Sequence, residues 1–315
     1  MYQNFVSSLF ISRDEAGIIP FRPWKGNPLL FSAQLLSRIR VTYPEGETSI
    51  LIEILVLSTF LACPLQEDET AEELVQVTLQ AYTEAIHPGQ AFHIAVRFKI
   101  APQWHIYWKS AGDSGLPIEI EVDAPEGFQV SKTLWPRPTS FVSGDFVDYG
   151  YEEKATLFVP VKAPLNLKKG KVTFRINVGI FVCSDICLDG NVERTVTLPT
   201  LTKTPEKTQT APPNLRKEFR ALPKKATEVQ LKDSSIYIRV PAGTHKNANF
   251  FPIETPGVRI GKAIFAFEGG QLEMRAPVKF FPKNALGKPI RIEGLIVLGK
   301  DRFDPSFEFI LEVPE

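Results

Sequence analysis

Apolar and polar residues alternate along much of the chain from residue 75 onward. The clearest run extends from Val172 to Val182, where every second residue is apolar. A period of two residues is typical of a strand that buries one face. By the same criterion we predict further strands. They are expected at Val75–Leu79, Phe92–Val96, Trp104–Lys109, Ile118–Val122, Lys132–Trp135 and Thr156–Val161, and near Val192–Leu198.

A stretch rich in Thr, Pro and Lys separates these strands from a second alternating part. Residues 199–213 have the composition of a linker, and Asn214–Leu222 is predicted to form a short helix. Beyond them, alternation returns in four segments. They are Ile236–Val240, Ala263–Phe267, Leu272–Met274 and Ile290–Val297.

These patterns predict an all-β protein. The number and spacing of the strands over residues 74–200 fit an immunoglobulin-like β-sandwich. We expect a linker with a short helix over residues 201–225. A second, smaller β-rich domain is expected over residues 226–315.

The most apolar run, Ile50–Ala62, lies ahead of these strands. Its 13 residues are too few to span a membrane and fit the core of a signal peptide, so we predict a signal-peptide-like segment over 50–63. Cys63 follows Phe60-Leu61-Ala62, which approximates a bacterial lipobox and makes it a candidate lipidation site. Residues 1–49 show no sustained period and are expected to be disordered or a mis-annotated extension. The alternative is a small N-terminal domain that buries residues 50–62.

Charge and composition exclude several classes of function. Lys plus Arg and Asp plus Glu both number 36, so no basic excess indicates nucleic-acid binding. The three cysteines and four histidines lack the spacing of a zinc site, and we expect neither a metal nor a cofactor. Export would allow the remaining cysteines to form a disulfide.

Cys183 and Cys187 close the clearest strand, and Cys183 lies out of phase with its apolar residues. Its sulfur is therefore expected to point away from the core. Residues four apart on a strand are separated by roughly 13 Å, whereas the Cα atoms of a disulfide are usually about 4.4–6.8 Å apart. The chain must turn between the cysteines, and Ser184-Asp185 supplies turn-forming residues. Asp189-Gly190 reads as a hairpin signal before the next strand. A redox pair and a structural staple both remain open.

Four motifs in order resemble the DsbD N-terminal domain family over about residues 74–200. They are Trp104–Pro117 (WHIYWKSAGDSGLP), Leu134–Pro138 (LWPRP), Tyr149–Glu152 (YGYE) and Phe181–Cys187 (FVCSDIC). The resemblance implies a periplasmic sandwich whose cysteine pair receives electrons from a membrane-embedded thiol reductase. The pair then passes them to thioredoxin-like periplasmic proteins.

The same resemblance implies which residues surround the cysteines. In the family an aromatic residue in a cap loop shields the pair, and residues 144–149 lie where that cap would be. We assign Phe146 as the shield and Tyr149 as a neighbour. His105 and Tyr107 match positions that line the site, although an ordinary solvent-facing pair is the alternative. Cys187 lies in the expected turn, so we assign it as the attacking sulfur and Cys183 as the resolving one.

Three hypotheses follow. The first is an exported thiol–disulfide oxidoreductase module that relays electrons through Cys183 and Cys187. The second is an envelope adaptor in which the disulfide is only structural. The third is a copper-handling protein that uses both thiols and His105. The chain has no bundle of long apolar helices and no thioredoxin-like C-x-x-C domain, so the first hypothesis requires partners for transfer across a membrane.

Overall fold

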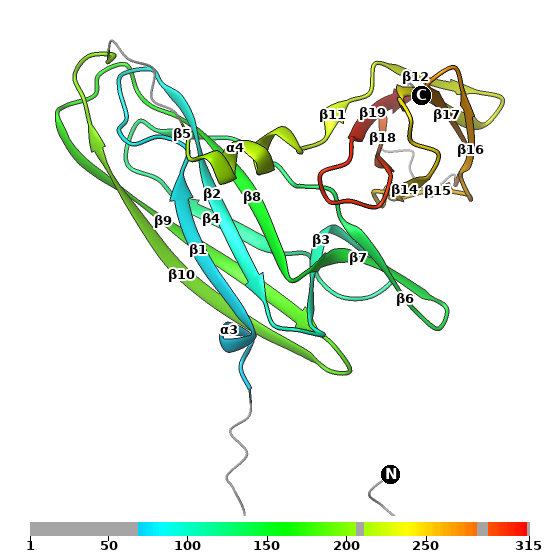
Figure 1. The fold of residues 1–315 in the computed structure, drawn as a ribbon, viewed down its shortest axis with the longest axis horizontal. Helices are drawn as coiled ribbons and strands as arrows, with labels where there is room; N and C mark the ends of the chain where they lie inside the picture. Colours follow the sequence, from blue (N-terminus) through cyan, green and yellow to red (C-terminus); the bar gives the residue numbers. More distant parts are fainter. Residues whose placement is uncertain (1–68, 206–210, 282–288, 314–315) are drawn as a thin grey trace, which may run out of the picture. The chain divides into compact units, whose positions relative to one another are not determined.

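The computed structural model describes residues 69–205, 211–281 and 289–313, which belong to one compact unit (Figure 1). Strands make up most of its regular structure, which confirms the predicted all-β class. The segment 50–63 with Cys63, and residues 1–49, lie outside the described residues. The domain bounds expected from the sequence stay predictions.

Residues 69–200, called here the first region, form two antiparallel sheets. One sheet has the order β1-β2-β8-β5, and the other has the order β10-β9-β3-β7-β6, with β4 beside β9. The elements are α3 (Ala71–Leu74), β1 (Val75–Ala81), β2 (Ala91–Ile100), β3 (His105–Gly112), β4 (Glu119–Asp123), β5 (Gln129–Val130), β6 (Thr139–Ser143), β7 (Phe146–Glu152), β8 (Lys154–Lys162), β9 (Gly170–Cys183) and β10 (Cys187–Thr200).

The first region's core lies between these sheets, where the alternation predicted it. In β9 the residues Phe174, Ile176, Val178, Ile180 and Val182 are all buried. Burying an apolar side chain of this size contributes about 1.5–3 kcal/mol, which explains why the periodic strands pack face to face.

The expected turn at Asp189-Gly190 is wrong, because both residues lie inside β10, opposite Phe181 and Ile180. Figure 1 shows β9 and β10 as two long neighbouring strands. Gly190 instead allows close approach of α3, since a Cβ there would lie 2.6 Å from Glu72 Oε1. That carboxylate accepts a hydrogen bond of 2.9 Å from the Asn191 backbone N–H.

The strand expected over Lys132–Trp135 is also wrong. Leu134 alone pairs there, as an isolated bridge to Phe158. Pro136 follows closely, and a proline has no backbone N–H to continue a ladder. In contrast, β6 and β7 form a hairpin that the alternation of apolar and polar residues did not predict.

Residues 224–313, called the second region, form two further sheets, which are mainly antiparallel. Their orders are β11-β19-β18-β14 and β12-β13-β17-β15, with β16 beside β17. The strands are β11 (Lys224–Lys225), β12 (Glu228–Lys232), β13 (Ser235–Pro241), β14 (Ala248–Pro252), β15 (Val258–Ile260), β16 (Ile264–Glu268), β17 (Gln271–Phe280), β18 (Ile290–Leu298) and β19 (Ser306–Val313). A separate core includes Ile238, Met274, Ile296 and Phe309.

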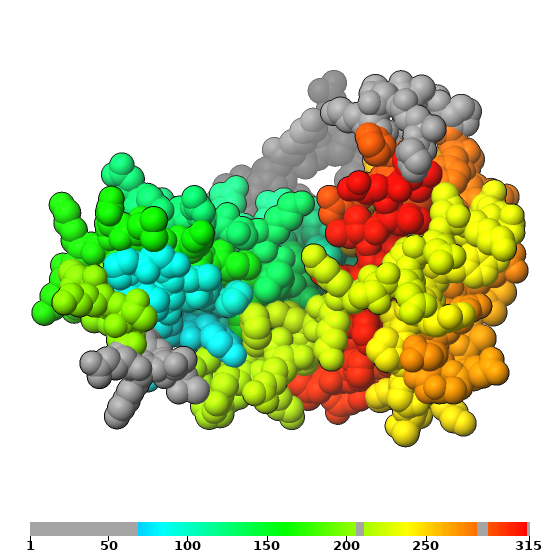
Figure 2. Space-filling view, turned by 90° about the horizontal axis from the view of Figure 1, so that it is seen from above, coloured from blue at the N-terminus to red at the C-terminus, as the bar shows by residue number. Residues whose placement is uncertain are grey.

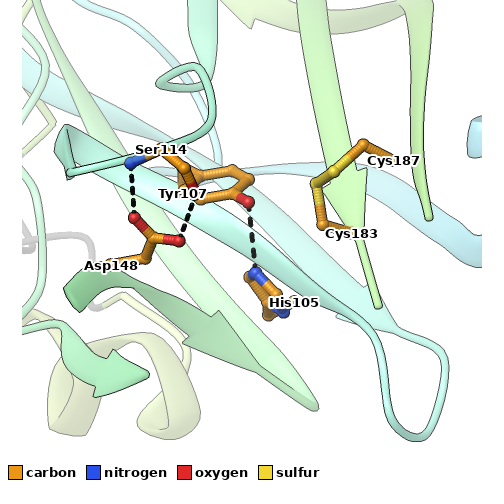
Figure 3. The surroundings of a disulfide bond; sticks show 6 residues. All are labelled: His105, Tyr107, Ser114, Asp148, Cys183 and Cys187. Carbon is orange, nitrogen blue, oxygen red and sulfur yellow. Dashed lines mark hydrogen bonds between the residues drawn. A yellow bond between two sulfur atoms is a disulfide. The ribbon is translucent and has the colours of Figure 1, made fainter. Parts of the chain in front are cut away.

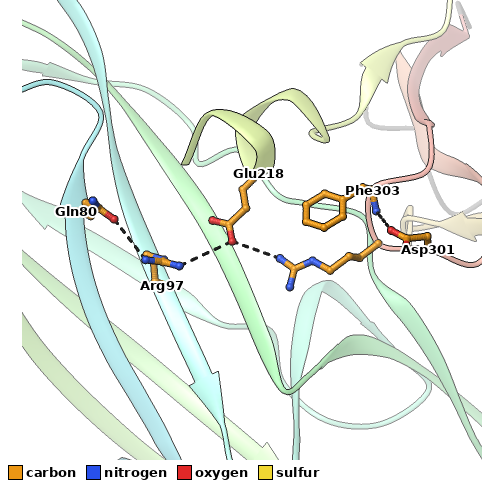
Figure 4. A network of polar contacts seen from close by, with 6 residues as sticks. Gln80, Arg97, Glu218, Asp301 and Phe303 are labelled. Carbon is orange, nitrogen blue, oxygen red and sulfur yellow. Dashed lines mark hydrogen bonds and ion pairs between the residues drawn. The ribbon is translucent and has the colours of Figure 1, made fainter. Parts of the chain in front are cut away.

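Helix α4 (Pro213–Arg220) connects the regions and confirms the short helix expected at 214–222. Its Leu215 and Phe219 pack on Phe158 of β8. Its Glu218 lies 3.9 Å from Arg97 of the first region and 3.7 Å from Arg302 of the second (Figure 4). In Figure 2 the yellow-green surface of the α4 segment adjoins the orange-red surface of the second region.

Two further contacts join the regions directly. Phe251 of β14 is 2% exposed and packs within the first region's core, against Trp108 and Tyr149. Arg137 donates hydrogen bonds to the backbone carbonyls of Leu298 (2.6 Å) and Gly299 (3.2 Å). The second region therefore packs against the sheet that contains β3 and β7.

Candidate disulfide site at the end of β9 and β10

Cys183 and Cys187 form a disulfide across the end of the β9–β10 hairpin (Figure 3). The two residues are register partners, and their Cα atoms are 4.1 Å apart. Ser184–Ile186 make the turn, in which the Ser184 N–H donates to the Ile186 carbonyl at 2.9 Å. The turn predicted at Ser184-Asp185 is thereby confirmed.

The two cysteines differ in exposure. Cys183 is 1% exposed, whereas Cys187 is an exposed residue, as expected from its place beside the turn. Ile186, between them, is 61% exposed. A protein that approaches the hairpin end therefore meets Cys187 before Cys183.

Cys183 lies on the face of its sheet opposite the sandwich core, as its phase predicted, but that face is covered. His105 of β3 is the register partner of Cys183. The Phe141 ring of β6 stacks on the His105 ring, with centroids 4.6 Å apart. Phe181, two residues before Cys183, packs near Tyr107 with ring centroids 5.9 Å apart. Aromatic residues thus lie beside the inner cysteine on the same face of the sheet.

Tyr107 is buried, so the solvent-facing alternative for this residue is wrong. Its hydroxyl shares a hydrogen bond of 3.3 Å with His105 Nε2. In Figure 3 the hydroxyl end of Tyr107 points toward the side on which the disulfide lies. His105 and Tyr107 therefore form a hydrogen-bonded pair beside Cys183.

A buried carboxylate holds the loop that covers Tyr107. Asp148 of β7 accepts hydrogen bonds from the Ser114 backbone N–H (2.7 Å) and from the Ser114 hydroxyl (2.5 Å). Gly115 adjoins this anchor with φ +79°, and a Cβ there would lie 2.2 Å from the Tyr107 ring. Only glycine lets the backbone approach the ring this closely.

Burial sets the protonation of the pair. It lowers the pKa of His105, against the opposing charges of Asp148 and Glu152, so the imidazole is neutral at neutral pH. Burial, followed by the charge of Asp148, raises the pKa of Tyr107. The charges acting on this pair are thus carboxylates, and negative charge beside a thiol disfavours its thiolate.

The two aromatic residues expected around the cap both lie on β7, which pairs with β3. Phe146 is 58% exposed and follows the Gly144–Asp145 turn of the β6–β7 hairpin. Tyr149 contacts Phe251, and its neighbour in register, Ser140, is exposed. Sequence reasoning missed Phe141 and Asp148. The signal for them was the Gly144-Asp145 turn, which brings β6 against β7.

The described ranges contain no group of three or more His, Cys, Asp or Glu side chains arranged to bind a metal ion. Within the same ranges, no helix is long and apolar enough to cross a membrane.

Comparisons with known proteins agree with the motifs. The family model described as "Thiol:disulfide interchange protein DsbD, N-terminal" matches residues 71–199. Among solved structures, the N-terminal periplasmic domain of ScsB from Proteus mirabilis is similar, with a TM-score of 0.50 and 15% identity. That match covers 79% of this chain and 96% of that chain. No curated protein matches the chain.

A second solved structure is the reduced N-terminal domain of DsbD from Neisseria meningitidis. It has a TM-score of 0.28 and 13% identity, and the match covers 45% of this chain and 94% of that chain. The likeness to the ScsB domain confirms the immunoglobulin-like β-sandwich, and it extends beyond residues 71–199. Residues 71–199 of this chain are thus similar to the family of DsbD N-terminal domains.

Proposed function

We propose that this chain is a thiol–disulfide interchange module of the periplasm. It relays electrons through Cys183 and Cys187 between a membrane-embedded thiol reductase of DsbD type and thioredoxin-like envelope proteins. The observation that carries the proposal is a disulfide at the turn end of a hairpin, in a domain similar to DsbD N-terminal domains, with one exposed and one buried cysteine. An exposed sulfur for a partner and an enclosed sulfur for resolution are what exchange requires.

The chemistry proceeds in two displacements. In the reduced module the Cys187 thiolate attacks one sulfur of a partner's disulfide. That disulfide breaks, a mixed disulfide forms, and the partner's second sulfur leaves as a thiolate that takes up a proton. Cys183 then loses its proton and attacks Cys187 Sγ, which forms the Cys183–Cys187 bond and releases the partner's first sulfur as a thiol. Two electrons have passed to the partner. The dithiol of the membrane reductase restores the module by the reverse steps.

The neighbours of Cys183 have supporting roles in this proposal. His105 is neutral and lies opposite Cys183, so it accepts the thiol proton during resolution. Tyr107 orients His105 through their hydrogen bond. Phe146, on the exposed β6–β7 hairpin, is proposed as the movable shield of the disulfide. Tyr149 is assigned to packing against Phe251.

A trapping experiment tests the proposal and the order of attack. Reduced full chain carrying Cys183→Ala or Cys187→Ala, each also with Cys63→Ser, is mixed with an oxidised thioredoxin-like periplasmic protein. The Cys183→Ala chain is expected to accumulate a covalent complex, seen by mass spectrometry under non-reducing conditions. The Cys187→Ala chain is expected to give none. If neither variant forms the complex, the relay is refuted, and a complex with Cys187→Ala alone reverses the assigned order.

We also propose that the chain is exported, with Cys63 as a lipid attachment site. The apolar run before Cys63 and the DsbD-type domain after it support this. The intact mass of the mature protein measures it, because a diacylglyceryl modification adds mass to an N-terminal Cys63. A mature chain that retains residues 1–62 would contradict the export proposal.

A further inference from the structure

A pocket of about 400 Å³ lies away from the disulfide, between the two regions and the end of α4. It is formed by β3, by the segment 133–135, by the chain from α4 into β11, and by β18 and β19. Its lining includes Trp108, Lys109, Trp135, Leu222, Leu295 and Glu308. The volume lies in the range of pockets that bind small molecules.

The walls of this pocket are mainly apolar. Trp108 and Leu295 are each 1% exposed, and Trp135, Leu134 and Leu222 are half-buried. The two indole rings and the leucine side chains can pack against the apolar part of a ligand. Apolar walls of this kind favour an aromatic or branched hydrocarbon group.

Two hydrogen-bond donors in the wall lack protein acceptors. The Trp108 Nε1–H is buried and has no hydrogen-bond partner within the described chain. The neighbouring Lys109 ammonium lies 5.2 Å from the centre of the Trp108 ring. Across the described ranges, it forms no ion pair within 4.0 Å. Because the Trp108 Nε1–H exposes no surface to the pocket, the Lys109 ammonium is the donor that a ligand acceptor can reach.

The charges at the pocket favour an anion. Lys109, Arg220 and Lys224 contribute three positive charges, and Glu308 contributes one negative charge. Burial lowers the pKa of Lys109, which means that the site removes water from the ammonium group. A ligand carboxylate would replace that water with a charge-assisted hydrogen bond.

We propose that this pocket binds a small organic anion with an aromatic or branched apolar body. Its carboxylate or sulfonate group accepts a hydrogen bond from Lys109 Nζ, while its apolar body packs between Trp135 and Leu222. The site requires no thiol and is independent of the proposed redox function.

A matched pair of fluorescent probes tests this proposal on the full chain. The anion 8-anilinonaphthalene-1-sulfonate has the required body and charge, and N-phenyl-1-naphthylamine has the same rings without the sulfonate. Titrations followed by probe fluorescence and calorimetry are expected to show one site that prefers the sulfonate. Lys109→Gln should weaken sulfonate binding about tenfold and leave the uncharged probe unchanged.

Two further variants complete the test. Thr133→Trp fills the pocket from a half-buried position and should abolish binding of both probes. Lys225→Gln removes an exposed lysine that is next to Lys224 but outside the lining, and it should change nothing. Circular dichroism establishes that each variant is folded. Absence of sulfonate binding, equal affinity for both probes, or binding that survives Thr133→Trp would each overturn the proposal.

Discussion

The first and second regions both enclose a core between two sheets, but they differ in where alternation of burial fails. In the second region, β17 buries every second residue from Leu272 to Val278. Its β18 is buried on both faces from Leu295 to Leu298, because Leu295 and Val297 pack into the first region's core while Ile296 and Leu298 pack into its own.

In the first region, alternation fails at the cysteine site. Ile106, Tyr107 and Trp108 are buried in succession, as are Val182 and Cys183. There the outer face is covered by the chain's own loop 112–115 and by aromatic side chains of neighbouring strands. Burial on both faces of a strand thus marks an interface in one region and an enclosed chemical site in the other.

The largest predicted effect tests the interface. Phe251→Ala removes a buried ring from the first region's core and should cost about 3–5 kcal/mol of unfolding free energy. Three of the four tryptophans, Trp104, Trp108 and Trp135, belong to the first region, so tryptophan fluorescence mainly reports its unfolding. The fluorescence and circular dichroism transitions are expected to shift together.

Phe309→Ala is the matched control, because this ring is buried in the second region's own core. It should shift the dichroism transition more than the fluorescence transition. The comparison would break if Phe251→Ala left the fluorescence transition in place.

A smaller effect tests the enclosure of the cysteine site. Gly115→Ala places a methyl group against the Tyr107 ring and should cost about 2–4 kcal/mol, from backbone strain and overpacking. Gly243 of the second region also has a positive φ, but a Cβ there meets nothing within 4 Å, so Gly243→Ala should cost about 1 kcal/mol. Urea unfolding measures both. An equal loss of unfolding free energy in the two variants would show that residue 115 is not packed against the Tyr107 ring.

The smallest predicted effect is a pH dependence. Burial lowers the pKa of His105, as it does for His93 on β2, so the folded state binds fewer protons than the unfolded state below the ordinary value of 6.5. Stability must then rise with pH through this window and level off above it. His105→Gln and His93→Gln should each flatten the rise, which urea unfolding between pH 5 and 7 measures. A slope left intact in both variants would contradict the burial of these rings.

The sequence predicted the strands wherever one face was apolar and the other polar, as in β9 and β13. It failed where contacts distant in sequence decide the outcome. Gly190 looked like a turn residue because its role, the approach of Glu72, involves a segment more than a hundred residues away. A solvent-facing Tyr107 remained an alternative to a site-lining one because alternation carries no information about the loop that covers it.

The candidate site was predictable in part for the same reason. Cys183 and Cys187 stood out because they lie at a strand end and out of phase with the core. Phe141 and Asp148 did not stand out, since their roles depend on how β6 and β7 fold back against β3. A polar residue such as Asp148 gives no sign of burial until its partner Ser114 is located.

The reduction potential of the Cys183–Cys187 pair shows most directly whether this disulfide is exchangeable or structural. The full chain with Cys63→Ser is equilibrated with glutathione redox buffers, and the oxidised fraction is measured by mass spectrometry after thiol alkylation. An exchangeable pair should have a potential between about −180 and −270 mV, as in oxidoreductases that exchange with partners. A value below about −300 mV would contradict it, because a disulfide of that stability is a structural staple.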